Sequence, residues 1–94
     1  MPSKLTESEI AAKLPAFTGW SALGDRSIRR TITFKDHITA MGFVVRVGMA
    51  AEVLDHHPDL RIVYNRVEIV LNTHDADGVT EKDFALAGRI DALV

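Results

Sequence analysis

The 94-residue sequence contains no cysteine, and glycine and proline are sparse, at six and three residues. Without cysteine the chain can form no disulfide, no thiolate metal site and no cysteine nucleophile, and a reducing cytoplasm suits it. Neither sign of charge dominates, because eleven Lys and Arg oppose thirteen Asp and Glu for a formal net charge of −2. We therefore expect a cytoplasmic protein that binds neither nucleic acid nor acidic membranes, since proteins that bind these are usually basic.

The sequence also lacks a long hydrophobic run and an apolar leader. Its most apolar stretch, residues 40–51, is interrupted by Arg46 and is shorter than the about 20 residues that span a bilayer. Residues 1–9 are polar and lack the apolar core of a signal peptide. The content of 47% hydrophobic residues is that of a folded globular protein. We expect a single domain over residues 1–94, because domains typically have about 100–150 residues.

Local patterns predict the elements of the N-terminal part. Thr6 and Glu9 have the T-x-x-E spacing of a capping box, which predicts a helix over residues 7–14. A short strand is expected at residues 20–23. Polar and apolar residues then alternate over residues 27–34, which predicts a strand with one half-buried face.

The longest predicted element is a helix over residues 37–56, with Asp36 as its N-cap. Its middle is apolar on almost every side, whereas a helix packed on one face of a sheet normally keeps a polar outer stripe. Either the helix is covered on both sides within its own domain, or its outer side meets a partner subunit. So short a chain has little left to cover both sides, and we favour the partner subunit.

The C-terminal half predicts a hairpin and a last helix. Residues 60–64 and 66–73 read as strands, and the Tyr64-Asn65 pair between them suits a tight turn with Asn in the left-handed conformation. A helix is expected over residues 81–92. The order is α-β-β-α-β-β-α, and the fold class is α+β: a four-stranded antiparallel sheet with the helices packed on one face.

Three of the four histidines fall in one region of this arrangement. His56 and His57 stand between the long helix and the third strand, and His74 follows the fourth strand. Pairing about the tight turn would oppose residues whose numbers sum to about 130, which brings His74 beside His56. Glu52 lies one helical turn before His56 and Asp55 is adjacent to it, so the corner holds three imidazoles and at least two carboxylates.

Four interpretations of this corner compete: capping or solvated histidines, a metal site, proton-transfer catalysis and a covalent hydrolase. The first suits an isolated residue such as His37 better than three converging imidazoles. Adjacent histidines point in divergent directions, unlike the H-x-x-x-H spacing of helical metal ligands, and no G-x-S-x-G nucleophile motif is present. Imidazole titrates near neutral pH and can both accept and donate a proton, so we favour acid–base catalysis.

The spacing of these residues resembles the pattern of the pterin-4a-carbinolamine dehydratases, which is E-x3-H-H-P followed by an aromatic residue, a histidine and an aspartate. The likeness extends over about residues 5–93. Two positions depart from the animal members, which have Trp in place of Leu60 and Arg in place of Lys82. The residues that match the pattern are Glu52, His56, His57, Pro58, Tyr64, His74 and Asp83.

The resemblance implies both a reaction and a site. The reaction is the loss of water from 4a-hydroxytetrahydropterin to give quinonoid dihydropterin, which recycles the pterin used by aromatic amino acid hydroxylases. It needs no metal and no organic cofactor. The implied catalytic residues are His56, His57 and His74. The implied substrate-binding positions are Glu52, Asp55, Pro58, Thr73 and Asp75.

The acid and base roles are assigned from helix polarity, and the partners from the resemblance together with the apolar long helix. The helix macrodipole favours a cationic imidazole at the end of the long helix, and we assign His57 as the base and His74 or His56 as the acid. The expected partners are a small pterin and further copies of the chain, as a homodimer or homotetramer. Two alternatives stay open: a non-catalytic dimerisation module, the role that animal relatives have for a homeodomain transcription factor, or work in another pterin pathway such as molybdopterin metabolism.

Overall fold

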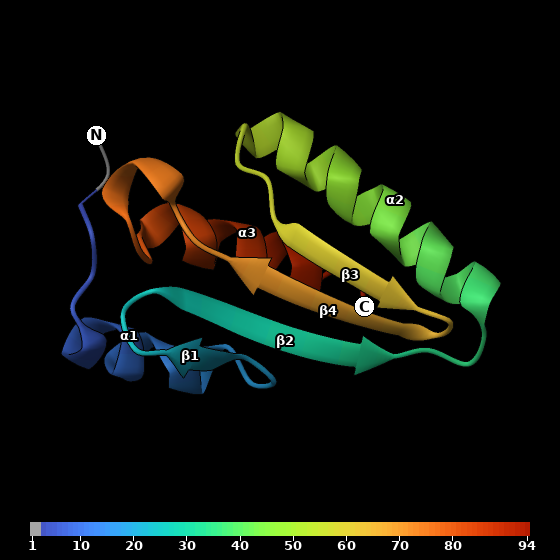
Figure 1. The fold of residues 1–94 in the computed structure, drawn as a ribbon, viewed down its shortest axis with the longest axis horizontal. Coiled ribbons are helices and arrows are strands. Elements are labelled where there is room, and N and C mark those ends of the chain that lie inside the picture. Colours follow the sequence, from blue (N-terminus) through green and yellow to red (C-terminus); the bar gives the residue numbers. More distant parts are fainter. Residues whose placement is uncertain (1–2) are drawn as a thin grey trace.

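The computed structural model describes residues 3–94. Its elements follow the predicted order α-β-β-α-β-β-α, with two short 3-10 turns added. Figure 1 shows the sheet with the long helix α2 alongside it. The elements are α1 (Glu7–Lys13), η1 (Leu14–Ala16), β1 (Ser21–Leu23), β2 (Ser27–Thr33), α2 (His37–Leu54), β3 (Asp59–Val63), β4 (Arg66–Leu71), η2 (His74–Ala76) and α3 (Glu81–Asp91).

Each α-helix begins at a residue whose side chain accepts a hydrogen bond from the first turn. Thr6 and Thr80 form capping boxes at α1 and α3, and Asp36 accepts from the Thr39 N–H at α2. The hydrogen bond from Thr39 lowers the pKa of the Asp36 carboxyl below its ordinary value of 3.8, because it favours the charged form. The predicted helix starts are confirmed, since capping is decided by neighbouring residues.

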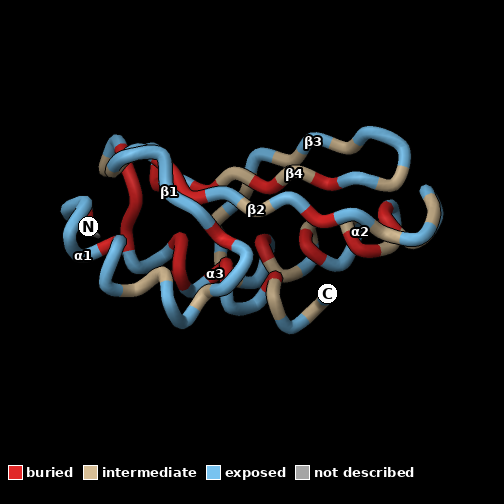
Figure 2. The backbone as a smooth tube through the Cα atoms, turned by 90° about the horizontal axis from the view of Figure 1, so that it is seen from below, coloured by how far each residue is buried: buried red, intermediate tan, exposed pale blue. Residues whose placement is uncertain are grey.

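The strands form one antiparallel sheet in the order β1-β2-β4-β3. The helices cover one face of it (Figure 2), which confirms the predicted α+β class. Pairing of Val63 with Arg66 centres the β3-β4 hairpin between Tyr64 and Asn65, one residue out of the expected register. Tyr64 has the left-handed backbone conformation, with φ of 53°, so our assignment of that conformation to Asn65 was wrong. The Asn65 side chain instead donates to the Phe34 carbonyl at 2.8 Å.

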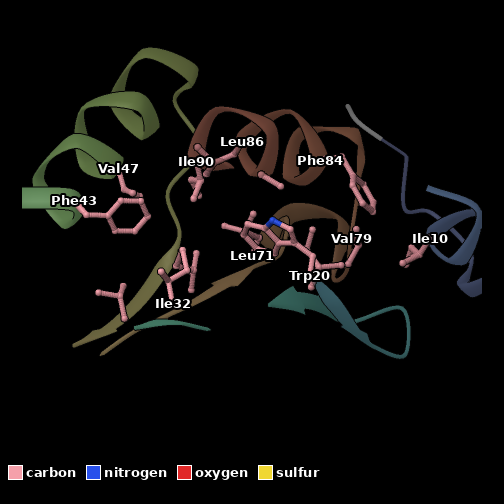
Figure 3. Packing of buried hydrophobic residues seen from close by; sticks show 14 of the residues in the cluster. Ile10, Trp20, Ile32, Phe43, Val47, Leu71, Val79, Phe84, Leu86 and Ile90 are labelled. Carbon is pink, nitrogen blue, oxygen red and sulfur yellow. The ribbon is translucent and has the colours of Figure 1, made fainter. Parts of the chain in front are cut away.

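The hydrophobic core lies between the sheet and the helices (Figure 3). Ile32 of β2 and Leu71 of β4 join Phe43 and Val47 of α2 and Ile90 of α3 in one buried cluster. All five are at most 9% exposed. The strand faces that alternation predicted to be half-buried are therefore the faces that pack against the helices.

The long helix α2 contributes only one of its sides to this core. Its buried residues are Ala40, Phe43, Val47 and Ala51. By length and composition alone α2 is apolar enough to cross a membrane, with a mean hydropathy of 1.4 over 18 residues. Only 22% of that stretch is buried, on the side that packs against the domain core, and its other side remains as an apolar surface. That surface exposes Ile38, Met41, Val45, Met49 and Val53.

Candidate active site

The two adjacent histidines stand where α2 reverses into β3. The helix ends at Leu54, two residues earlier than predicted, because Asp55 takes the left-handed conformation with φ of 50°. The His56 N–H then donates to the Ala51 carbonyl at 3.1 Å. A left-handed residue followed by this backward hydrogen bond is a common way to end a helix. The reversal leaves His56 and His57 as the first residues beyond the helix.

The rings of these histidines have different partners. His56 Nε2 lies 2.6 Å from Asp83 Oδ1, with 11% of the His56 side chain and none of the Asp83 side chain exposed. His57 Nε2 lies 2.5 Å from Glu52 Oε1, and both of these side chains are more than half exposed. The divergent directions expected of adjacent histidines are therefore observed, and each imidazole has its own carboxylate.

Asp83 joins three parts of the chain at this corner. Its Oδ2 accepts from the Thr73 hydroxyl at 3.0 Å and from the Thr80 N–H at 2.9 Å, while its Oδ1 contacts His56. The Thr73 and Thr80 hydroxyls are 2.6 Å apart. The carboxylate thus connects the end of α2 to the start of α3 and to the segment after β4.

Sequence reasoning identified Asp83 as part of the family pattern, but did not place it among the site residues. The capping spacing from Thr80 shows that Asp83 serves the helix start. It carries no information about a ring 27 residues away. That contact depends on how α3 packs beside the end of α2.

His74 lies on a short turn beyond the fourth strand. β4 ends at Leu71, two residues earlier than predicted, and His74 opens η2. Thr73 pairs with Gly78 across this turn. A side chain at Gly78 would not fit, because a Cβ there would lie 2.6 Å from the Asp25 carbonyl oxygen.

The His74 turn is linked to the adjacent histidines through its neighbour Thr73, which bonds to the Asp83 that holds His56. His74 is exposed and helps to line a cavity of about 130 Å³, whose lining includes Arg26 but neither His56 nor His57. A single pocket lined by all three imidazoles stays a prediction.

The predicted substrate-binding residues occupy different environments around this corner. Glu52 bonds to His57, Asp55 and Asp75 are exposed, and Pro58 is half-buried. Thr73 is only 5% exposed, and its hydroxyl bonds within the Asp83 network. Within residues 3–94, no group of three or more His, Asp or Glu side chains is arranged to hold a metal ion. The contacts of these predicted substrate-binding residues with a substrate stay predictions.

The chemistry available at this corner is proton transfer. A carboxylate oxygen accepts hydrogen bonds, so each ring donates from Nε2 and keeps Nδ1 for another partner. An imidazole has two ring nitrogens, so it can accept a proton at one of them and donate from the other. His56 and His57 can therefore each take part in a proton transfer.

Comparison with known proteins places this arrangement in a family. The family model described as pterin 4 alpha carbinolamine dehydratase matches residues 3–93. Among relatives that carry the family's name, one from Picosynechococcus sp. is 48% identical over 99% of this chain and 100% of its own length. Another, from Nitrobacter hamburgensis, is 47% identical over 99% of this chain and 93% of its own length.

Solved structures give the same result at the level of the fold. A crystal structure of a transcriptional coactivator/pterin dehydratase from Brucella melitensis has a TM-score of 0.92 and 43% identity, covering 97% of this chain and 98% of that one. A pterin dehydratase-like protein described as a RuBisCO assembly factor in the alpha-carboxysome shares the fold, with a TM-score of 0.68, 22% identity and coverage of 80% and 88%. The chain belongs to the pterin-4a-carbinolamine dehydratase family, a family of hydro-lyases, as its histidine spacing predicted.

Proposed function

We propose that this protein catalyses the loss of water from 4a-hydroxytetrahydropterin by histidine acid–base catalysis. The observation that carries the proposal is the pair of imidazole–carboxylate contacts after α2, His56 with Asp83 and His57 with Glu52. Membership of a dehydratase family supports the choice of substrate. The proposed catalytic set is His56, His57 and His74.

The proposed reaction needs two proton transfers and no redox change. A base removes the proton from the ring nitrogen beside the 4a carbon, and the electron pair of that N–H bond forms a C=N double bond. The C–O bond breaks, and an acid protonates the departing hydroxyl, which leaves as water. We assign His57 as the base and His56 or His74 as the acid; each transfer contributes about 10²–10⁴-fold to the rate.

A stopped-flow assay on freshly generated 4a-hydroxytetrahydropterin tests this proposal. The wild-type protein should speed the appearance of quinonoid dihydropterin above the uncatalysed rate, and His57→Ala should remove most of that acceleration. His37→Ala is the matched control, because His37 lies at the opposite end of α2 and its Nδ1 contacts the Tyr64 carbonyl instead. A wild-type protein that leaves the uncatalysed rate unchanged would reject the proposal.

The physiological setting is part of the same proposal. We place the reaction in the cytoplasm, where it would recycle the pterin of an aromatic amino acid hydroxylase. A hydroxylase gene next to this one in the genome would support recycling, whereas neighbouring genes of molybdopterin metabolism would favour the other pterin pathway. Cell fractionation with an antibody against the chain checks the location.

We also propose that the chain self-associates through the exposed side of α2. Val45 and Val53 on that side are 60% and 75% exposed. Between α2 and the end of α3 lies a cavity of about 420 Å³ lined by Met49, Val53 and Leu93. A row of exposed apolar side chains along one side of a helix is characteristic of contact with another protein. No nucleic-acid or membrane partner enters the proposal.

Light scattering with a matched pair of variants tests self-association. The wild-type protein should be at least a dimer at micromolar concentration, and Val45→Glu should lower its mass towards that of a monomer, because a charge cannot be buried there without cost. Thr31→Glu places the same charge at an exposed position of β2 and should leave the mass unchanged. A monomeric wild-type protein would contradict the proposal.

A further inference from the structure

The contact between His56 and Asp83 determines where the protons of that ring lie. Asp83 Oδ1 is 2.6 Å from His56 Nε2, and a carboxylate oxygen can only accept. Nε2 must therefore carry a hydrogen, so the neutral form of His56 is the Nε2–H tautomer with an unprotonated Nδ1. Within residues 3–94, the hydrogen bonds of this ring involve Nε2 alone.

The other side of Asp83 is fixed as well. Its Oδ2 accepts from the Thr80 backbone N–H at 2.9 Å, and a backbone N–H can never become an acceptor. The Thr73 hydroxyl donates to the same oxygen at 3.0 Å, and Thr73 can in turn accept from the Thr80 hydroxyl 2.6 Å away. The Asp83 side chain is fully buried, so its two oxygens cannot exchange roles by turning towards water.

Building on the proposed function, we infer that Asp83 is a positioning residue that fixes the tautomer of His56, so that Nδ1 is the ring nitrogen that exchanges a proton with the substrate. Asp83 itself touches no reacting atom. It acts through His56, as the carboxylate of a serine protease acts through its histidine, where replacement by the amide lowers kcat by about 10⁴-fold because the tautomer is wrong.

The variant Asp83→Asn tests this inference because the network dictates how the amide must sit. The Thr80 N–H requires the amide oxygen, which leaves the amide NH₂ facing His56 Nε2. Nε2 must then accept, and the ring proton moves to Nδ1. Giving that proton to the substrate would leave an imidazolate anion, so the ring can no longer serve as the acid. Asp36→Asn is the matched control, because Asp36 is also a capping aspartate and asparagine caps helices about as well.

Two measurements are made on each protein: ¹⁵N NMR of the histidine rings and stopped-flow turnover. In the wild type we expect neutral His56 to be protonated at Nε2. In Asp83→Asn it should be protonated at Nδ1, and kcat should fall by about 10²-fold or more, the contribution of one proton transfer. Asp36→Asn should match the wild type in both measurements.

Several outcomes would overturn the inference. They are a wild-type His56 protonated at Nδ1, an Asp83→Asn protein that keeps the Nε2–H tautomer, and an Asp83→Asn protein with the flipped tautomer and undiminished kcat. If Asp83→Asn does not fold, the wild-type tautomer alone decides. A wild type without dehydratase activity rejects the proposed function instead, while its NMR spectrum still tests the control of the tautomer by Asp83.

Discussion

The two adjacent histidines should differ sharply in what they contribute to stability. His56 is 11% exposed and bonds to a fully buried carboxylate, whereas His57 and its partner Glu52 are 55% and 78% exposed. His56→Ala leaves Asp83 Oδ1 buried without its donor. An unsatisfied buried acceptor costs about 1–3 kcal/mol, and a charged one more. His57→Ala breaks only a solvent-exposed pair, which is worth roughly 0–1 kcal/mol.

The expected magnitude follows from the exposure of the site. Removing a ring that is 11% exposed admits some water to Asp83, so we take a destabilisation of about 2 kcal/mol for His56→Ala. In a domain of this size each 1 kcal/mol lowers Tm by about 4–8 °C, which gives a fall of about 8–16 °C. His57→Ala should change the free energy of unfolding by less than about 0.5 kcal/mol.

Urea and thermal unfolding, followed by circular dichroism at one protein concentration, would measure both variants against the wild type. The concentration is held fixed because self-association would add to apparent stability. Equal Tm values for His56→Ala and the wild type, or an equal loss in both variants, would refute the reasoning that the buried carboxylate depends on His56.

Three further outcomes are expected. His57→Ala and His74→Ala should each lower turnover by about 10²-fold or more. In single-turnover assays the rate loss of the double variant should be smaller than the product of the two single losses, since residues that act as a unit are not additive. A multiplicative loss would show that the two residues act separately. Exhaustive chelation should leave activity unchanged, and activity that disappears and then returns with one added metal would contradict this. Because the folded-state pKa of Asp36 lies below its ordinary 3.8, its cap stabilises the fold above that pH and is lost as pH falls through the lowered value. Asp36→Asn should therefore lose less stability than the wild type in an acid titration below pH 3.8, measured by urea unfolding.

Much of the fold could be predicted because it depends on neighbouring residues. The caps at Thr6 and Asp36 were read from short spacings, and polar–apolar alternation located β2. Such features need only the periodicity of a helix or a strand.

The tertiary structure alone decided the contacts between distant elements. Asp83 reaches His56 across 27 residues, and Asp91 accepts hydrogen bonds from Arg30 and from Trp20, 71 residues away. The sequence by itself determined the family, because the types and spacing of its histidines and carboxylates are local and specific. It could not determine that one buried carboxylate holds one of those rings, because that depends on how helices and strands pack, and packing brings together residues that no local period relates.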